Sequence, residues 1–435
     1  MPATDSDLSP VLQALSRLCA TDALQAGEPD GAAEERFFAQ GQIPLAALSV
    51  QVQGLGVLEQ PVQHAQGQAL HAACSPALHG RREQTLLDPQ VRDTGEIAAD
   101  ALALHWADGA LQALQADVAQ ALGLQALQAR VHNLLVYGPG QFFKPHQDTE
   151  KHPGMVATLV LVWPSAHIGG ALRVVHGRQQ DGLESQHLRA DALRWFAFYA
   201  DCQHEVLPVQ EGWRVVLTFD LVVPPLQTQA HSQPNPALLR ALREQCFPCG
   251  APSAEPWVFL LDHEYTEHGL HWHLLKGLDR PRVAALRAAA QELGLVMHLT
   301  LAEIHETWTA TPRYRGRYDE AGEPEPDELI EDGMLLDFWV DADGQRLRRH
   351  ALRVNLHAAE SFTDTGEDYL VNEEYEGYMG NYGETLDYWY RRAALVLHTP
   401  HAEQAARFAT DFDAALQDAL ALARSGDQAA LAQRL

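Results

Sequence analysis

A histidine and an aspartate stand two residues apart in the stretch FFKPHQDT, which follows the turn sequence YGPGQ. In an extended segment, the side chains at positions i and i+2 point to the same side. His146 and Asp148 therefore converge, as a corner of a metal site, an acid–base pair or a surface ion pair. His204 and Arg214 follow further along the chain, in YADCQHEV and GWRVV.

Two histidines and one carboxylate are the ligands with which non-haem oxygenases hold Fe(II) on one face, and the other face stays open. A guanidinium on a neighbouring strand suits a dicarboxylate, because its planar fork grips a carboxylate through two hydrogen bonds. The residues therefore predict an iron site at His146, Asp148 and His204. We expect 2-oxoglutarate to chelate the iron and to anchor its far carboxylate on Arg214.

Simpler interpretations of the same residues remain open. His146 and Asp148 could form a surface hydrogen-bonded pair, and His204 could be a buried histidine satisfied by the backbone. Arg214 could pair with an acid such as Glu205 or Asp220.

Five segments between residues 129 and 223 are rich in β-branched and aromatic residues and are bounded by turn formers. No helical pattern separates them, which favours an all-β sandwich or barrel over a parallel sheet. The expected strands are ARVHNLLVYG, MVATLVLVW, GALRVVH, LRWFAFYA and WRVVLTFDLVV.

The motifs YGPGQFFKPHQDTE, IGGAL and YADCQHEVLPVQEGWRVVLTFDL resemble the Fe(II)/2-oxoglutarate-dependent oxygenases, and among them the prolyl 4-hydroxylase-like branch. The resemblance covers about residues 125–225. It implies a double-stranded β-helix (jelly roll) with His146, Asp148 and His204 as iron ligands and Arg214 as the 2-oxoglutarate anchor. It also implies that two further residues, Tyr137 and Thr158, line the co-substrate pocket.

The activity implied by the resemblance is dioxygenase hydroxylation of a C–H bond in a protein or peptide side chain, with release of succinate and CO2. O2 is the other co-substrate, and ascorbate could serve as a reductant. Proline is the favoured target, although Phe143 stands where several prolyl hydroxylases have Tyr and Arg214 where many have Lys. The alternatives are a catalytically silent β-helix binding module, a small-molecule hydroxylase of the same superfamily and a cupin-like dioxygenase without 2-oxoglutarate.

Charge and composition exclude some partners. The 435 residues include 31 Lys and Arg and 58 Asp and Glu, for a net charge of −27, which argues against a nucleic-acid surface. No apolar run long enough for a membrane span and no signal peptide are seen, and five sparse cysteines suggest a reducing compartment. We expect a soluble, cytoplasmic protein, and the sequence does not indicate its oligomeric state.

The expected organisation is an α+β chain with a catalytic β-helix core flanked by helices. Residues 1–100 read as an N-terminal helical and mixed segment, 101–225 as the oxygenase domain, 226–236 as a linker and 237–435 as a C-terminal α+β domain of unknown role. Arg391 and Arg392 in YWYRRAALVLH echo WRVVLTFDL, which suggests a degenerate second β-helix. The stretch RYDEAGEPEPDELIEDG reads as an acidic loop and EQAARFATDFDAALQDALALA as one closing helix.

Two further motifs raise the question of a second metal. The stretch HEYTEHGLHWH contains His263, His268, His271 and His273, but no partner follows at a recognisable spacing, so solvated loop histidines are favoured. Cys246 and Cys249 form a single CxxC without a second pair. We expect these cysteines to be structural.

Overall fold

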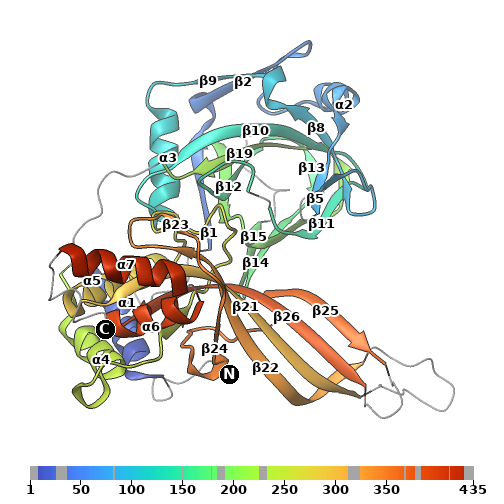
Figure 1. Cartoon of the computed structure of the whole chain (residues 1–435). Coiled ribbons are helices and arrows are strands. Elements are labelled where there is room, and N and C mark those ends of the chain that lie inside the picture. The colour runs from blue at the N-terminus through green and yellow to red at the C-terminus, as the bar shows by residue number, and fades with distance from the viewer. Residues whose placement is uncertain are drawn as a thin grey trace. The chain divides into compact units, whose positions relative to one another are not determined.

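A computed structural model describes residues 8–25, 37–81, 84–148, 150–177, 179–183, 192–224, 233–311, 324–366, 369–377, 384–410 and 412–425 (Figure 1). The chain divides into two compact units. Unit 1 comprises Met1–Glu34 and Thr228–Leu435, and unit 2 comprises Glu35–Gln227. No helix in the described part of the chain is long and apolar enough to cross a membrane.

Unit 2 is built mainly of strands. Its helices are α2 (His64–Ala73) and α3 (Ala110–Ala121). Its strands are β1 (Phe38–Pro44), β2 (Leu48–Val52), β3 (Gly56–Val57), β4 (Ser75–Pro76), β5 (His79–Arg81), β6 (Gln84–Leu86), β7 (Arg92–Asp93), β8 (Gly95–Ala98), β9 (Leu102–Trp106), β10 (Gln128–Tyr137), β11 (Phe142–His146), β12 (Met155–Trp163), β13 (His167–Gly169), β14 (Leu172–His176), β15 (Gln179–Leu183), β16 (Ala192–Tyr199), β17 (Gln203–Val206), β18 (Val209–Gly212) and β19 (Arg214–Val222).

Two antiparallel sheets make the core of unit 2. The larger has the order β1-β16-β12-β19-β10-β8-β4, and the smaller has the order β15-β14-β17-β11-β7. From β10 onward the chain alternates between them, because β10, β12, β16 and β19 lie in the larger sheet while β11, β14 and β17 lie in the smaller. This alternation between two antiparallel sheets is the jelly-roll arrangement expected above.

The central strands of the larger sheet are buried on both faces. Every residue of β12 and β19 is buried, and such strands read as continuous apolar runs instead of alternating patterns. Helix α3 is tied to this sheet, since the hydroxyl of Tyr199 on β16 donates a 2.6 Å hydrogen bond to the carbonyl of Leu122 after the helix. The run MVATLVLVW is therefore the fully buried strand β12, in the centre of the larger sheet.

The units differ from the ranges expected from the sequence. Strand β1 pairs with β16 and β8 pairs with β10, so much of the segment 1–100 completes the larger sheet. Helix α1 instead belongs to unit 1, where Val11 and Leu15 join an apolar cluster with Leu238 and Leu242. Most of the expected linker 226–236 lies outside the described residues, and α4 begins at Pro236.

Unit 1 combines helices with antiparallel strands. Its helices are α1 (Pro10–Gln25), α4 (Pro236–Cys246), α5 (Asp279–Leu293), α6 (Pro400–Thr410) and α7 (Phe412–Ser425). Its strands are β20 (Trp257–Leu260), β21 (Val296–Thr311), β22 (Glu325–Val340), β23 (Arg346–Leu347), β24 (Leu352–Val354), β25 (Leu370–Glu376) and β26 (Thr385–His398). The sheet order is β20-β26-β21-β22-β23, with β24 beside β22 and β25 beside β26; Figure 1 shows its long strands.

Three expectations for unit 1 differ from the structure. Its described strands form a single sheet, whereas a second β-helix would need two facing sheets. Residues 325–333 of the expected acidic loop are the first part of β22, paired with β21; residues 312–323 lie outside the described part. The expected closing helix is two helices, α6 and α7.

Candidate metal centre

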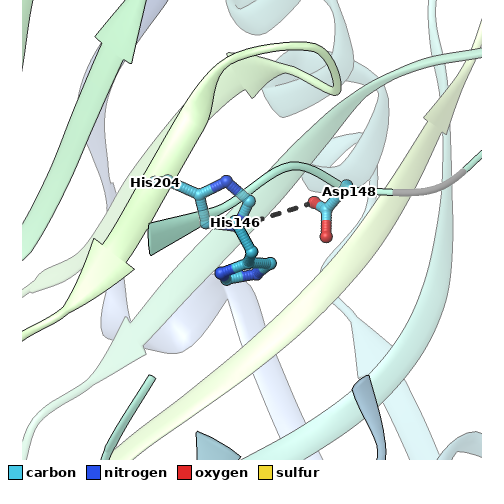
Figure 2. A group of neighbouring side chains, drawn as sticks. All are labelled: His146, Asp148 and His204. Carbon is cyan, nitrogen blue, oxygen red and sulfur yellow. Dashed lines mark ion pairs between the residues drawn. The ribbon is translucent and has the colours of Figure 1, made fainter. Parts of the chain in front are cut away.

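His146, Asp148 and His204 lie together in unit 2 (Figure 2). His146 ends β11 and faces His204 on β17 in the antiparallel register. One ligand atom from each of the three side chains lies within 4.8 Å of the others, and His204 Nε2 is 3.9 Å from Asp148 Oδ2. The structure thus brings His204 to the sequence-adjacent pair His146 and Asp148, because β11 and β17 are neighbours in the smaller sheet.

Both histidines are oriented by backbone carbonyls. His146 Nδ1 is 2.9 Å from the carbonyl oxygen of Lys144, and His204 Nδ1 is 3.2 Å from that of Cys202. A carbonyl only accepts hydrogen bonds, so each Nδ1 carries the proton and donates. Each Nε2 is then left with its lone pair, which is the tautomer that metal-binding histidines need.

Aromatic rings hold the imidazoles in place. The His146 ring stacks on Phe143 with centroids 3.4 Å apart, and His204 lies 4.5 Å from Phe198. The two imidazole centroids are 4.1 Å apart. These contacts restrict the rotation of both rings, so the two Nε2 atoms and the carboxylate are presented to a common point.

The protonation states also suit metal binding. Burial and the neighbouring His204 lower the pKa of His146 to about 3, so its imidazole is neutral at pH 7. Burial by itself would raise the pKa of Asp148, but His204, Lys151 and the other polar neighbours bring it below its usual range. The site therefore contains a carboxylate beside a neutral imidazole, and a donor set of two imidazole nitrogens and one carboxylate could hold Fe(II) with open positions left.

Thr158 lies on β12 directly beside this group. Its hydroxyl donates a 2.5 Å hydrogen bond to Asp148 Oδ2. The resemblance implies that Thr158 lines the co-substrate pocket, which stays a prediction; the contact that the structure shows is with the carboxylate. The hydroxyl fixes which way this carboxylate points.

Arg214 begins β19 opposite Tyr137, the last residue of β10. Its guanidinium lies over the Tyr137 ring, 5.2 Å from the centroid, and the residue is only 2% exposed. Among the described residues, no hydrogen bond or ion pair is made by Arg214, and its Nε is buried without a partner. A buried cation without an acid is costly, so this guanidinium is suited to an external carboxylate.

The acids that could have satisfied Arg214 are used elsewhere. Glu205 lies 3.4 Å from Arg173. Asp220 is surrounded by the side chains of His132, Lys151 and His152 at 3.3–3.8 Å. Within the described ranges, Arg214 therefore forms no ion pair with Glu205 or Asp220.

The glycine pair in IGGAL makes room for Arg214. Gly170 has φ +71°, and a Cβ there would lie 2.7 Å from Cδ of Arg214.

His167, at the start of β13, is a neighbour that the sequence did not single out. Burial and the charge of Arg214 lower its pKa to about 4; only its position two residues before the glycine pair could have drawn attention to it.

Three histidines of the stretch HEYTEHGLHWH, namely His268, His271 and His273, form no group of three ligand-type side chains in the described part of the chain. His271 and His273 contact each other with Nδ1 atoms 2.6 Å apart, but no third ligand-type side chain joins this pair in the described part of the chain, and His268 belongs to no such group there. The backbone N–H of His263 donates to Asp279. Burial raises the pKa of Cys246 to about 12, so its side chain is a thiol at pH 7, and Cys249 is exposed.

The model of one protein family, the 2OG-Fe(II) oxygenase superfamily, matches residues 132–219. The matched segment runs from β10 to β19 and contains His146, Asp148, His204, Arg214 and Tyr137. The family resemblance stated from the motifs is thereby confirmed for this part of the chain.

Solved structures similar to this chain include two prolyl hydroxylases. A Pseudomonas putida prolyl-4-hydroxylase has 19% identity and a TM-score of 0.30, covering 47% of this chain and 98% of its own. A prolyl hydroxylase from Trichoplax adhaerens, in complex with a hypoxia inducible factor oxygen degradation domain peptide fragment, has 13% identity and a TM-score of 0.27, covering 51% and 96%. A Burkholderia pseudomallei oxidoreductase of the 2OG-Fe(II) oxygenase family has 15% identity and a TM-score of 0.25, covering 47% and 89%. No curated protein matches the chain.

Proposed function

We propose that this protein is an Fe(II)- and 2-oxoglutarate-dependent dioxygenase that hydroxylates a C–H bond in a protein or peptide side chain, with release of succinate and CO2. The single observation that carries the proposal is Arg214, a buried guanidinium without an acidic partner among the described residues. It belongs to the same β-helix as a two-histidine, one-carboxylate group. A metal-binding protein that used no dicarboxylate would have no need for such a cation.

The three side chains of the candidate metal centre would hold the iron. His146 and His204 would bind through Nε2, since each Nδ1 is occupied by a carbonyl. Asp148 would bind through its carboxylate, which the hydroxyl of Thr158 orients. Fe(II) held in this way would supply the activation of O2, with 2-oxoglutarate as the reductant that is decarboxylated.

The residues around Arg214 would select the co-substrate. Its planar guanidinium would bind the far carboxylate of 2-oxoglutarate through paired hydrogen bonds. The ring of Tyr137 covers one side of the guanidinium. His167 stays neutral at pH 7 because its pKa is lowered to about 4, so it adds no second positive charge.

The substrate that we propose is a peptide or protein, with proline as the first residue to test. The net charge of −27 favours neutral or cationic macromolecules over nucleic acids and other polyanions. The alternative is a small-molecule hydroxylase of the same superfamily. Such an enzyme would use the same iron ligands and the same 2-oxoglutarate anchor, so these residues do not distinguish the two. Ascorbate would act as an added reductant that keeps the iron ferrous.

Succinate formation by the full chain, with and without added Fe(II), tests the activity. Arg214→Met should raise the KM for 2-oxoglutarate about 10- to 100-fold, the loss of a charge-assisted hydrogen bond of about 1.5–3 kcal/mol, whereas Arg214→Lys should lose less. Arg173→Met is the matched control, since Arg173 makes its ion pair on the exposed side of the smaller sheet. Wild-type protein that binds Fe(II) but never forms succinate would identify a silent binding module.

Turnover that is equally fast without 2-oxoglutarate would identify a cupin-like dioxygenase instead. The substrate class is tested by mass spectrometry of peptides and proteins incubated with the enzyme. A gain of about 16 Da on proline supports the proposal, while hydroxylation confined to small molecules contradicts its peptide part.

A further inference from the structure

A second group of ligand-type side chains lies in unit 1, within one module of helices and strands. His298 is on β21, His398 ends β26 and Glu403 is in the first turn of α6. One ligand atom from each lies within 4.8 Å of the other two. The strands that carry the two histidines are paired neighbours, with His298 opposite Val396 and Val296 opposite His398, so the imidazoles are diagonal neighbours in the sheet.

The spacing of the ligand atoms matches that of the candidate metal centre. Glu403 Oε1 lies 3.9 Å from His298 Nε2, and Glu403 Oε2 lies 3.7 Å from His398 Nε2. The corresponding separation between Asp148 and His204 is also 3.9 Å. Bonds of about 2.0–2.2 Å to a zinc ion put tetrahedral ligand atoms about 3.4 Å apart, so each of the two distances between a histidine and Glu403 would need to close by only a few tenths of an ångström.

The local backbone fixes Glu403 in this position. Thr399 caps α6, because its hydroxyl accepts from the backbone N–H of Ala402 while its carbonyl accepts from that of Glu403. The same hydroxyl donates to the carbonyl of Ser253 at 3.0 Å. The capped turn joins the end of β26 directly to α6, so His398 and Glu403 are held by one short rigid connection.

The histidines are deeply buried and only partly satisfied. His398 is 0% exposed, and neither ring nitrogen has a hydrogen-bond partner among the described residues. His298 is 3% exposed, and its Nδ1 also lacks a partner there. Burial lowers the pKa of His298 to about 4 and that of His398 to about 3, so both imidazoles are neutral and have a lone pair to offer at pH 7.

The competing explanation is a structural polar cluster centred on Arg349. Its Nη1 lies 3.2 Å from both oxygens of Glu403, and its guanidinium stacks over Trp339 at 4.3 Å. This pairing neutralises the carboxylate without any metal. It leaves the Nε2 of His398, the ring nitrogen nearest to the carboxylate, without a hydrogen bond, and buried polar atoms in folded proteins are nearly always paired.

We propose that His298, His398 and Glu403 form a second metal site that takes a divalent zinc-like ion and fastens α6 to the sheet of unit 1. Two imidazoles and one carboxylate are ligands typical of Zn²⁺, which keeps a fourth position for water. Arg349 would retain one oxygen of Glu403 and orient the carboxylate. The ion's role would be structural, and the site is separate in sequence from the residues of the proposed oxygenase reaction.

The test uses the full chain with the first site disabled. In His146→Ala/His204→Ala protein, stripped of metal with a chelator, we expect added Zn²⁺ to bind at one equivalent per chain and to raise the melting temperature. Introducing His398→Gln into this double variant should abolish both the Zn²⁺ binding and the rise in melting temperature. His305→Gln is the matched control, because His305 lies on β21 with His298 but is only half-buried and pairs with Asp387; it should leave Zn²⁺ binding unchanged.

Co²⁺ gives a second readout, since four-coordinate Co²⁺ absorbs visible light far more strongly than the six-coordinate ion. The double variant should show these bands, and His298→Gln should remove them. If the double variant binds no stoichiometric Zn²⁺, or His398→Gln binds as much as its parent, the group is the polar cluster around Arg349 and the proposal is wrong. Because the readout is metal content in a chain without the first site, it is independent of succinate formation. Should His398→Gln fail to fold, the loss or retention of the Co²⁺ bands in His298→Gln decides the question instead.

Discussion

The hydroxyl of Thr158 donates a 2.5 Å hydrogen bond to the same carboxylate oxygen of Asp148 that lies 3.9 Å from His204 Nε2. Thr158 is on β12, whose residues are all buried, so the hydroxyl is held on a strand that does not move easily. A partner of this kind sets the direction of the carboxylate without contacting the metal.

Replacing Thr158 with Val keeps the shape and removes the hydroxyl. We expect Fe²⁺ affinity to fall about 10- to 100-fold, the usual effect of losing a group that orients a metal ligand. Thr158→Ser keeps the hydroxyl and should retain most of the affinity. Titration of metal-free protein with Fe²⁺ under anaerobic conditions measures the change, and equal affinities for Thr158→Val and wild type would show that the hydrogen bond does not orient the ligand.

The room beside Arg214 depends on Gly170, and Gly170→Ala should damage co-substrate binding. The new Cβ would lie 2.7 Å from Cδ of Arg214, at a residue with φ +71°. We expect the KM for 2-oxoglutarate to rise about tenfold or more, by displacement of the guanidinium from a bidentate geometry, while Fe²⁺ binding is kept. Gly123 also has φ +71° but has nothing within 4 Å of its Cβ position, so Gly123→Ala reproduces the backbone strain alone. A similar KM in both variants would contradict the argument.

Arg392 shows what a buried arginine looks like when its role is structural. It is 1% exposed and donates to the carbonyls of Thr363 and Leu261 and to the hydroxyl of Ser361. Arg392→Met should therefore lower the free energy of unfolding of unit 1 by about 3–5 kcal/mol. The change leaves these three buried acceptors without their donor and removes the cation that lies 3.7 Å from the Asp262 carboxylate.

The neighbouring Arg391 is exposed, so Arg391→Met should change stability by less than about 0.5 kcal/mol. Urea unfolding followed by far-ultraviolet circular dichroism compares the two variants. If Arg392→Met unfolds at the wild-type urea concentration, the hydrogen-bond network contributes little. Neither change should alter the KM for 2-oxoglutarate, in contrast to Arg214→Met.

Much of the candidate site could be predicted because its signals are local. His146 and Asp148 are two apart in an extended segment, and each core strand of the β-helix is a short run of β-branched and aromatic residues. Burial on both faces makes β12 and β19 read as plain apolar runs. The residue types of His204 and Arg214 suggest an iron ligand and a carboxylate anchor, and the family resemblance supports these roles. No local pattern indicates that the two residues lie beside His146 and Asp148.

The remaining features depend on pairings between distant segments. Nothing near Phe38 indicates that β1 pairs with β16 and completes the larger sheet, so the segment 1–100 was expected to be separate. Residues 325–333 were expected to be a loop because acidic side chains dominate them. In the structure they form an exposed strand, whose charges remain in solvent while its backbone pairs with β21.

The same limit applies to side-chain partners. That Thr158 contacts Asp148, and that Glu205 and Asp220 are occupied by other cations, are facts of three-dimensional packing. The contacts of Glu205 and Asp220 leave the Arg214 guanidinium able to bind a ligand carboxylate. The group formed by His298, His398 and Glu403 was missed for this reason, since its two histidines lie on strands that are distant in sequence and become neighbours only in the sheet.

His167 makes a testable contribution to the pH dependence of stability. Burial and the charge of Arg214 lower its pKa from 6.5 to about 4 in the folded chain. Above pH 6.5 neither the folded nor the unfolded state is protonated there, so the residue contributes nothing. Below pH 6.5 the imidazole becomes protonated in the unfolded state, whereas in the folded state it stays neutral down to about pH 4. The free energy of unfolding therefore falls as the pH decreases through this window. Between pH 7 and 4 the loss from His167 should be about 3 kcal/mol. His167→Gln, which does not titrate, should lose that much less over the same range in urea unfolding of metal-free protein. Parallel curves for the two proteins would show that the pKa of His167 is not lowered in the folded chain.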